Sequence, residues 1–117
     1  MIDRSFDQVL ESARAGDGRA FEHLYDSLHR RVYAFAAVRG ASDPEALVNE
    51  VFLKVFTNLS AFVGNEAQFS GWVFKIARNT LIDEARRRKR RVAESELDEN
   101  HESKAAQGDV ETEALAH

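Results

Sequence analysis

The chain has 117 residues, of which 44% are apolar and 31% charged, and it contains no cysteine. This length suits one small domain and excludes a large multidomain enzyme. Without cysteine there is neither a disulfide framework nor a thiolate metal site, and we expect a cytoplasmic protein. No stretch reaches the ~20 apolar residues that would span a bilayer, which argues against a membrane protein.

The charges are distributed unevenly. The net charge is −4 at pH 7. Residues 92–117 hold eight acidic residues and one lysine, a net charge of −7, whereas residues 71–91 hold eight basic and two acidic residues, a net charge of +6. The acidic total therefore conceals a strongly basic segment, which favours an anionic partner.

The first two elements are predicted helices. The segment Ser5–Gln8 (SFDQ) has the form of a capping box, and the short helix that follows it ends at Gly16. Asp17 can cap a second helix that runs to Gly40. Its apolar residues recur at steps of three and four and form one stripe: Phe21, Leu24, Tyr25, Leu28, Val32, Phe35 and Ala36.

A third helix is predicted from Ser42 to Leu59. The segment Ser42–Glu45 (SDPE) offers a cap, a proline for the first turn and a capping-box glutamate. The apolar stripe of this helix is Leu47, Val48, Val51, Phe52, Val55, Phe56 and Leu59. Residues 60–69 (SAFVGNEAQF) break the pattern and predict a loop.

The last helix is predicted to begin near Ser70 and to end near Arg91. Its inward stripe comprises Trp72, Val73, Ile76, Ala77, Thr80, Leu81 and Ala85. Large apolar residues become rare after Arg91, so residues 92–117 are predicted to be a disordered acidic tail. The predicted fold is all-α: a compact bundle of about four helices over residues 1–91, followed by this tail.

Catalytic and metal sites are poorly supported. The four histidines lack metal-ligand spacing and a paired carboxylate on a common face, and the six glycines form no phosphate loop. We therefore predict a binding protein that is not an enzyme and that uses no cofactor or metal.

The run Arg86–Arg91 (RRRKRR) favours nucleic acid, because phosphates best relieve the repulsion among six consecutive cations. A solvated helix end is the alternative. Upstream, Lys75, Arg78 and Asn79 lie on the polar face and could reach phosphates and base edges. Within the run, the expected DNA contacts are Arg86, Arg87 and Arg90.

Two aromatic residues of the predicted loop, Phe62 and Phe69, suit the capture of an unpaired base. This role requires exposed rings. The alternative is closure of the apolar core, and for either residue alone we favour it.

The segment from about Asp17 to Arg91 resembles region 2 of bacterial extracytoplasmic-function sigma factors, the short alternative members of the sigma-70 family. The resemblance rests on SDPEALVNEVFLKVF, on the loop up to Phe69 and on SGWVFKIARNTLIDEARRRKRR, in this order and at the right spacing. It implies a transcription-initiation factor that binds the clamp helices of the beta-prime subunit of RNA polymerase core. It also implies that the domain recognises and melts the promoter minus-ten element through its non-template strand.

The resemblance also implies site residues. The polymerase-facing residues are Asp43, Glu45, Leu47, Val48, Asn49, Glu50 and Phe52. The DNA-facing residues are Phe69, Trp72, Lys75, Arg78, Asn79 and Arg86. Because Leu47, Val48 and Phe52 also belong to an apolar stripe, we expect some of them in the core, and for Trp72 we favour packing over contact.

The chain departs from the family pattern at two positions. Where the family usually has a sequence like Asp-Leu-x-Gln-Glu, residues 46–50 read Ala-Leu-Val-Asn-Glu. Ala46 lacks a carboxylate and Asn49 is a shorter amide, so we expect weaker polymerase binding. The acidic segment resembles the linker to region 4, and we expect no region 4 domain in this chain.

Two other functions remain open. One is a protein-interaction module whose basic face is covered by an anti-sigma factor or by the acidic tail. The other is a basic amphipathic helix that lies on an anionic membrane. Comparing binding to polymerase core with binding to a minus-ten single strand separates these alternatives from the sigma-factor hypothesis.

Overall fold

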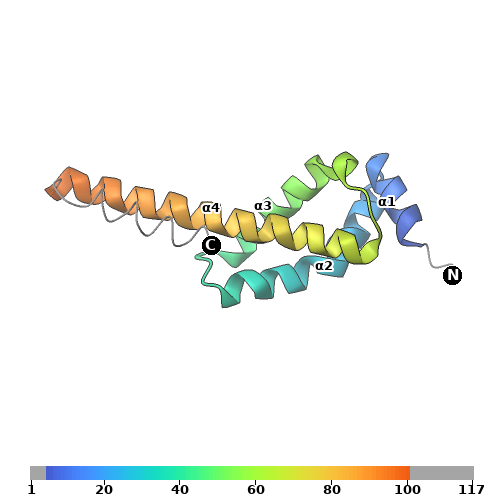
Figure 1. Cartoon of the computed structure of the whole chain (residues 1–117), viewed down its shortest axis with the longest axis horizontal. Coiled ribbons are helices and arrows are strands. Elements are labelled where there is room, and N and C mark those ends of the chain that lie inside the picture. Colours follow the sequence, from blue (N-terminus) through green and yellow to red (C-terminus); the bar gives the residue numbers. More distant parts are fainter. Residues whose placement is uncertain (1–4, 101–117) are drawn as a thin grey trace. The chain divides into compact units, whose positions relative to one another are not determined.

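The computed structural model describes residues 5–100 of the chain. They form four α-helices and one short 3-10 helix: α1 (Phe6–Arg14), α2 (Gly18–Val38), α3 (Pro44–Thr57), η1 (Leu59–Ala61) and α4 (Glu66–Asn100) (Figure 1). No strand occurs in this part of the chain, so the all-α prediction is confirmed. The chain divides into two units, Met1–Arg78 and Asn79–His117.

Side-chain caps fix where the first two helices begin. The amide of Gln8 donates to Ser5 Oγ at 3.2 Å, and the Ser5 amide donates to Gln8 Oε1 at 3.0 Å, which confirms the capping box at the start of α1. Gly16 turns the chain with a φ of 94°, a conformation that favours glycine. Asp17 then caps α2 by accepting a hydrogen bond from the Arg19 amide.

The cap of α3 is Asp43, which accepts a hydrogen bond from the Ala46 amide at 3.1 Å. Pro44 is the first helical residue, as predicted. Because the cap is Asp43 and not Ser42, Glu45 is only the second helical residue and not the third one that a capping box needs. The helix ends at Thr57, two residues before the predicted end at Leu59.

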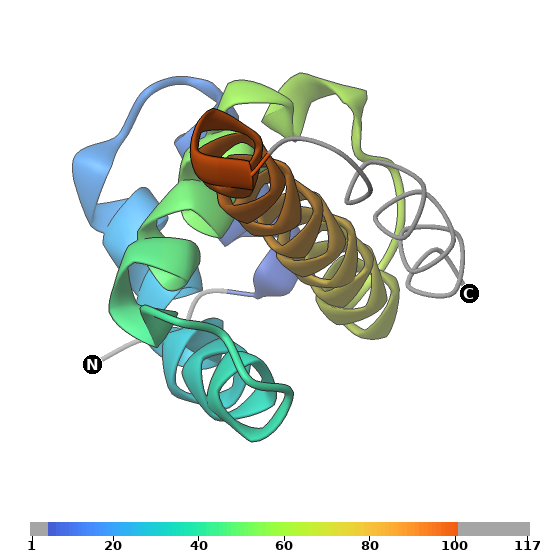
Figure 2. The same ribbon diagram turned by 90° about the vertical axis from the view of Figure 1, so that its left-hand side faces the viewer.

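The core of the first unit forms where α2 packs against α1 and α3, and Figure 2 shows α2 and α3 side by side. The predicted stripes supply most of it. Buried apolar residues of these three helices are Val9, Leu10, Ala13, Ala20, Leu24, Leu28, Val32, Ala36, Leu47, Val48, Val51, Phe52 and Val55. Ring pairs also join α2 to α3: Phe21 with Phe56 at 4.7 Å and Tyr25 with Phe52 at 4.9 Å between centroids.

Helix α4 begins at Glu66, four residues before the predicted start at Ser70. Asn65 and Gln68 form a reciprocal pair: the Gln68 amide donates to Asn65 Oδ1 at 2.9 Å, and the Asn65 amide donates to Gln68 Oε1 at 2.8 Å. This is the hydrogen-bond pattern of a capping box, and it starts the helix inside the predicted loop. Phe69 therefore lies in the first turns of α4 and not in a loop.

Helix α4 continues to Asn100, nine residues beyond the predicted end near Arg91. The helix therefore includes residues 92–100, the first part of the predicted tail. The rest of the predicted tail, residues 101–117, lies outside the described residues. None of the described helices combines the length and apolar character needed to cross a membrane.

Candidate functional site

The sequence-predicted polymerase residues separate into buried and accessible members. Leu47, Val48 and Phe52 are buried, each 3% exposed, and thus belong to the core and not to a contact surface. The expectation that some of them are core residues holds for all three. Asp43, Glu45 and Asn49 are exposed and Glu50 is half-buried.

An exposed row of side chains runs along α3 at steps of four residues, and we call it the α3 face: Glu45, Asn49 and Leu53. Leu53 is 67% exposed and was missed by the sequence analysis. The sequence could have indicated that Leu53 is exposed, because this leucine lies four positions after Asn49 and outside the apolar stripe of the helix. Beside this face, Lys54 Nζ lies 3.5 Å from Glu50 Oε2. The α3 face thus combines a carboxylate, an amide and one large apolar side chain.

The first unit contains four of the predicted DNA residues on α4: Phe69, Trp72, Lys75 and Arg78. Lys75 and Arg78 are exposed, as a phosphate-binding role requires. Trp72 is half-buried, and its indole packs 5.2 Å from the Phe62 ring and 5.9 Å from the Phe69 ring, centroid to centroid. Packing is therefore a role of Trp72.

The second unit contains the remaining predicted DNA residues. Asn79 and Arg90 are exposed, and Arg86 and Arg87 are half-buried. One neighbouring cation of the run is paired within the helix: Arg88 Nη1 lies 3.7 Å from Glu84 Oε2, a spacing of four residues. The exposed amide of Asn79 has the donors and acceptors that can pair with a base edge, whereas the arginines suit phosphates.

Phe62 and Phe69 are buried, as the core alternative that we favoured for either residue alone predicts, so neither presents the exposed ring that base capture requires. Phe62 is 5% and Phe69 2% exposed, because their rings pack edge to face at a centroid distance of 5.3 Å. The side chain that projects from this loop is Val63, which is 87% exposed. Phe69 also lines a hollow of about 170 Å³ together with Phe6, Val9, His23, Leu24, Ser27, Leu28, Arg31, Glu66 and Ser70.

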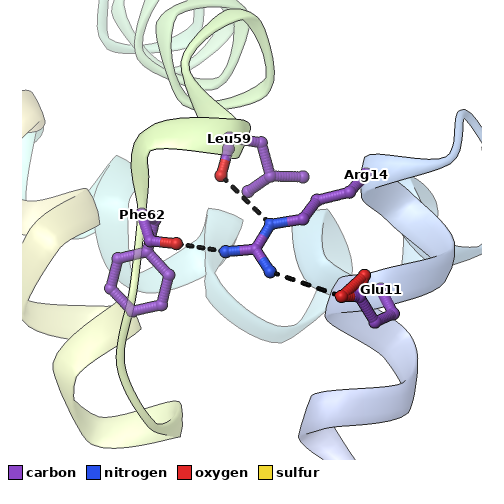
Figure 3. Close-up of polar contacts among 4 residues, drawn as sticks. All are labelled: Glu11, Arg14, Leu59 and Phe62. Carbon is purple, nitrogen blue, oxygen red and sulfur yellow. Dashed lines mark hydrogen bonds and ion pairs between the residues drawn. The ribbon is translucent and has the colours of Figure 1, made fainter.

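Arg14, which the sequence analysis did not single out, connects α1 to the loop after α3 (Figure 3). Its Nε donates to the carbonyl oxygen of Leu59 at 3.5 Å, and its Nη2 donates to the carbonyl oxygen of Phe62. Its Nη1 lies 3.7 Å from Glu11 Oε2. These loop carbonyls are 45 and 48 residues away along the chain, so no local sequence pattern could have revealed the contact.

The arrangement has the properties of a binding surface. Among residues 5–100, no three histidine, cysteine or carboxylate side chains come together as a possible metal site. The exposed groups are amides, carboxylates, cations and single apolar side chains, which recognise partners by hydrogen bonds, charge and packing.

The comparisons with known proteins agree with this reading. The family model for sigma-70 region 2 matches residues 21–91. The ECF RNA polymerase sigma factor BldN of Streptomyces coelicolor is 33% identical over 78 residues, which cover 65% of this chain and 30% of that protein. A probable RNA polymerase sigma factor of Haemophilus influenzae is 41% identical over 69 residues, which cover 59% of this chain and 35% of that protein.

A longer match is to the ECF RNA polymerase sigma-E factor of Escherichia coli K12, at 33% identity over 112 residues. It covers 91% of this chain and 58% of the relative, so the chain spans only part of the curated relatives that it matches. No solved structure gives a significant match. The matched family model, the names of these relatives and the all-α fold lead to one conclusion: the chain belongs to the sigma-70 family, as a region 2 domain of the extracytoplasmic-function group.

Proposed function

We propose that this domain acts in transcription initiation by binding RNA polymerase core and by recognising and melting the promoter minus-ten element. In this proposal the α3 face, together with Asp43 and Glu50, contacts the clamp helices of the beta-prime subunit. The residues of α4 that contact the non-template strand are Lys75, Arg78, Asn79, Arg86, Arg87 and Arg90.

One observation carries the proposal. In both the predicted polymerase set and the predicted DNA set, apolar residues are buried while polar residues reach the surface. The apolar members of the polymerase set are in the core, while its polar members are accessible. In the DNA set, the two phenylalanines are buried, while Lys75, Arg78 and Asn79 are exposed. Most polar residues that the resemblance assigns to the two partners are therefore exposed, on separate helices, while Glu50 and Arg86 are half-buried.

The chemistry of the proposed step is binding without covalent change. Unpairing and unstacking promoter bases costs a few kcal/mol, which contacts to the separated strand must offset. Cationic side chains of α4 supply phosphate contacts that are independent of sequence. Asn79 supplies donors and acceptors for a base edge and hence the discrimination between sequences.

Two matched substitutions test the proposal, because Asn49 and Asn79 are both exposed amides within helices. Asn49→Ala and Asn79→Ala remove the same group, and alanine favours helix at either position. Each full-length variant is measured against RNA polymerase core and against matched and scrambled minus-ten single strands. We expect Asn49→Ala to weaken only core association and Asn79→Ala to weaken only binding of the matched strand.

The outcomes are distinct. If Asn79→Ala lowered the affinity for matched and scrambled strands by the same factor, Asn79 would not read sequence. If the wild-type chain bound core but no strand, the domain would be a polymerase-binding module without promoter recognition. Loss of core association in Asn79→Ala, but not in Asn49→Ala, would contradict the assignment of the two helices.

A further inference from the structure

We propose that Arg14 is a positioning residue, which holds residues 59–65 in the conformation in which the domain binds the minus-ten strand. The proposal rests on the proposed function for its DNA-binding consequence. Its basis is the set of contacts that tie this loop to α1 at one end and to α4 at the other.

Each of the three nitrogens of the Arg14 guanidinium contacts a different group. Nε and Nη2 donate to the carbonyl oxygens of Leu59, the first residue of η1, and of Phe62, the residue that follows η1. Nη1 faces the carboxylate of Glu11 on the same helix (Figure 3). The Arg14 side chain is 26% exposed, so most of its surface is covered by the protein. Arg14 therefore fixes the backbone at two points of the loop.

The other end of the loop is fixed by different groups. Asn65 and Gln68 form the reciprocal cap of α4. Between the two anchors lie only Val63 and Gly64, and Val63 points into solvent. The Arg14 contacts and the cap together thus constrain the position of Val63 and Gly64, the part of the loop that a partner would meet.

Phe62 is the residue through which a shift of the loop would reach α4. Its carbonyl oxygen accepts the hydrogen bond from Arg14, and its ring packs on Trp72 and Phe69. Lys75 lies one turn of α4 after Trp72. Releasing the Phe62 carbonyl therefore frees a ring next to the part of α4 that carries the proposed DNA residues.

The proposed role suits arginine in particular. A planar fork can donate to two carbonyl oxygens at once, whereas the ammonium of lysine acts as a single point charge on a flexible stem. Arg14 also lies outside residues 21–91, the part that matches the family model. The loop of this region 2 domain is therefore held from a helix that precedes the matched segment.

The test uses the full-length chain with Arg14→Ala and Arg14→Lys. Trp72 is the only tryptophan, so its emission reports on the packing of Phe62. Glu11→Gln is the control that removes the ion pair but leaves both loop carbonyls bound to Arg14. Arg19→Ala removes the same charge from an exposed position at the start of α2. Trp72 emission, thermal melting, core association and binding of matched minus-ten strands are measured for each variant.

We expect Arg14→Ala to shift Trp72 emission to longer wavelength and to weaken strand binding about tenfold, because a loose loop must be ordered on binding. Core association stays unchanged, since the α3 face is not altered. Arg14→Lys gives an intermediate result, and both controls behave like the wild type.

Three results would overturn the proposal. One is a folded Arg14→Ala chain with wild-type emission and strand affinity. Another is equal weakening by Arg19→Ala, which would indicate a general effect of charge. The third is loss of core and strand binding in the same proportion, which would indicate a purely structural role. If Arg14→Ala did not fold, the same criteria would apply to Arg14→Lys. If the wild-type chain bound no strand, the proposed function would fail, and Trp72 emission would still decide whether Arg14 positions the loop.

Discussion

The ring of Phe62 packs against the indole of Trp72 with 5.2 Å between the centroids, and this contact ties the loop after α3 to the second turn of α4. Phe69 completes the cluster, and Phe6 of α1 packs on Phe69 at 5.5 Å. Aromatic pairs at such distances contribute about 0.5–1.5 kcal/mol beyond the area that they bury. The cluster therefore holds the one loop residue in it, Phe62, against rings of α4.

Phe69→Ala is expected to lower the free energy of unfolding by about 3–5 kcal/mol, because it removes a fully buried ring and leaves a cavity. Val63→Ala is the control, and its effect should stay within about 0.5 kcal/mol because the side chain is exposed. Urea unfolding followed by far-ultraviolet circular dichroism measures both. A Phe69→Ala chain of wild-type stability with weakened strand binding would instead place this ring at the DNA.

Gly64→Ala is expected to destabilise the domain by about 1–3 kcal/mol. The φ of Gly64 is 154°, and an added Cβ would lie 2.7 Å from Gln68 Oε1 and 3.0 Å from Phe62 Cζ. Gly71→Ala is the matched control inside α4, where an added Cβ meets nothing within 4 Å. This control should stabilise the domain by about 0.5–1 kcal/mol, since alanine favours helix. Thermal melting of both variants checks the opposite signs, and melting temperatures that shift in the same direction would contradict the prediction.

Restoring the family-like groups on α3 is expected to strengthen polymerase binding. Ala46→Asp and Asn49→Gln alter exposed positions, so neither disturbs the core. A charge-assisted contact contributes about 1.5–3 kcal/mol, and each 1.4 kcal/mol changes affinity about tenfold. The dissociation constant for RNA polymerase core is therefore expected to fall at least about tenfold in the double variant. Strand binding serves as the control, and unchanged core affinity would show that these positions do not contact polymerase.

Arg90→Ala is expected to weaken binding of matched and scrambled single strands equally, because a phosphate contact carries no sequence information. The slope of log affinity against log salt concentration should become shallower by about 0.7, the contribution of one phosphate on a single strand. Titrations of labelled strands at several salt concentrations measure this slope. A preference between the two strands that changed on substitution would assign Arg90 to base recognition instead.

Local patterns in the sequence predicted the helices well where a cap and a periodic stripe coincide. Ser5 with Gln8, Asp17 and Pro44 mark helix starts because they satisfy or remove backbone donors within the same turn, which requires no distant partner. The Asn65–Gln68 pair carried the same kind of signal, and it was overlooked because the surrounding residues, rich in small and polar side chains, resemble a loop.

The residue types of the candidate site could be predicted from the sequence, but which of their side chains are exposed could not. The sequence determined the helical stripes, the basic run after Asp83 and the resemblance to region 2, because each depends on neighbours along the chain. Only the tertiary structure decided that Phe62 and Phe69 face the core, that Leu53 does not, and that Arg14 holds two carbonyl oxygens of a loop 45 and 48 residues away. Those outcomes depend on how α1, the loop after α3 and the first turns of α4 pack on one another. A periodic pattern identifies which side of a helix is apolar without specifying which surface covers it.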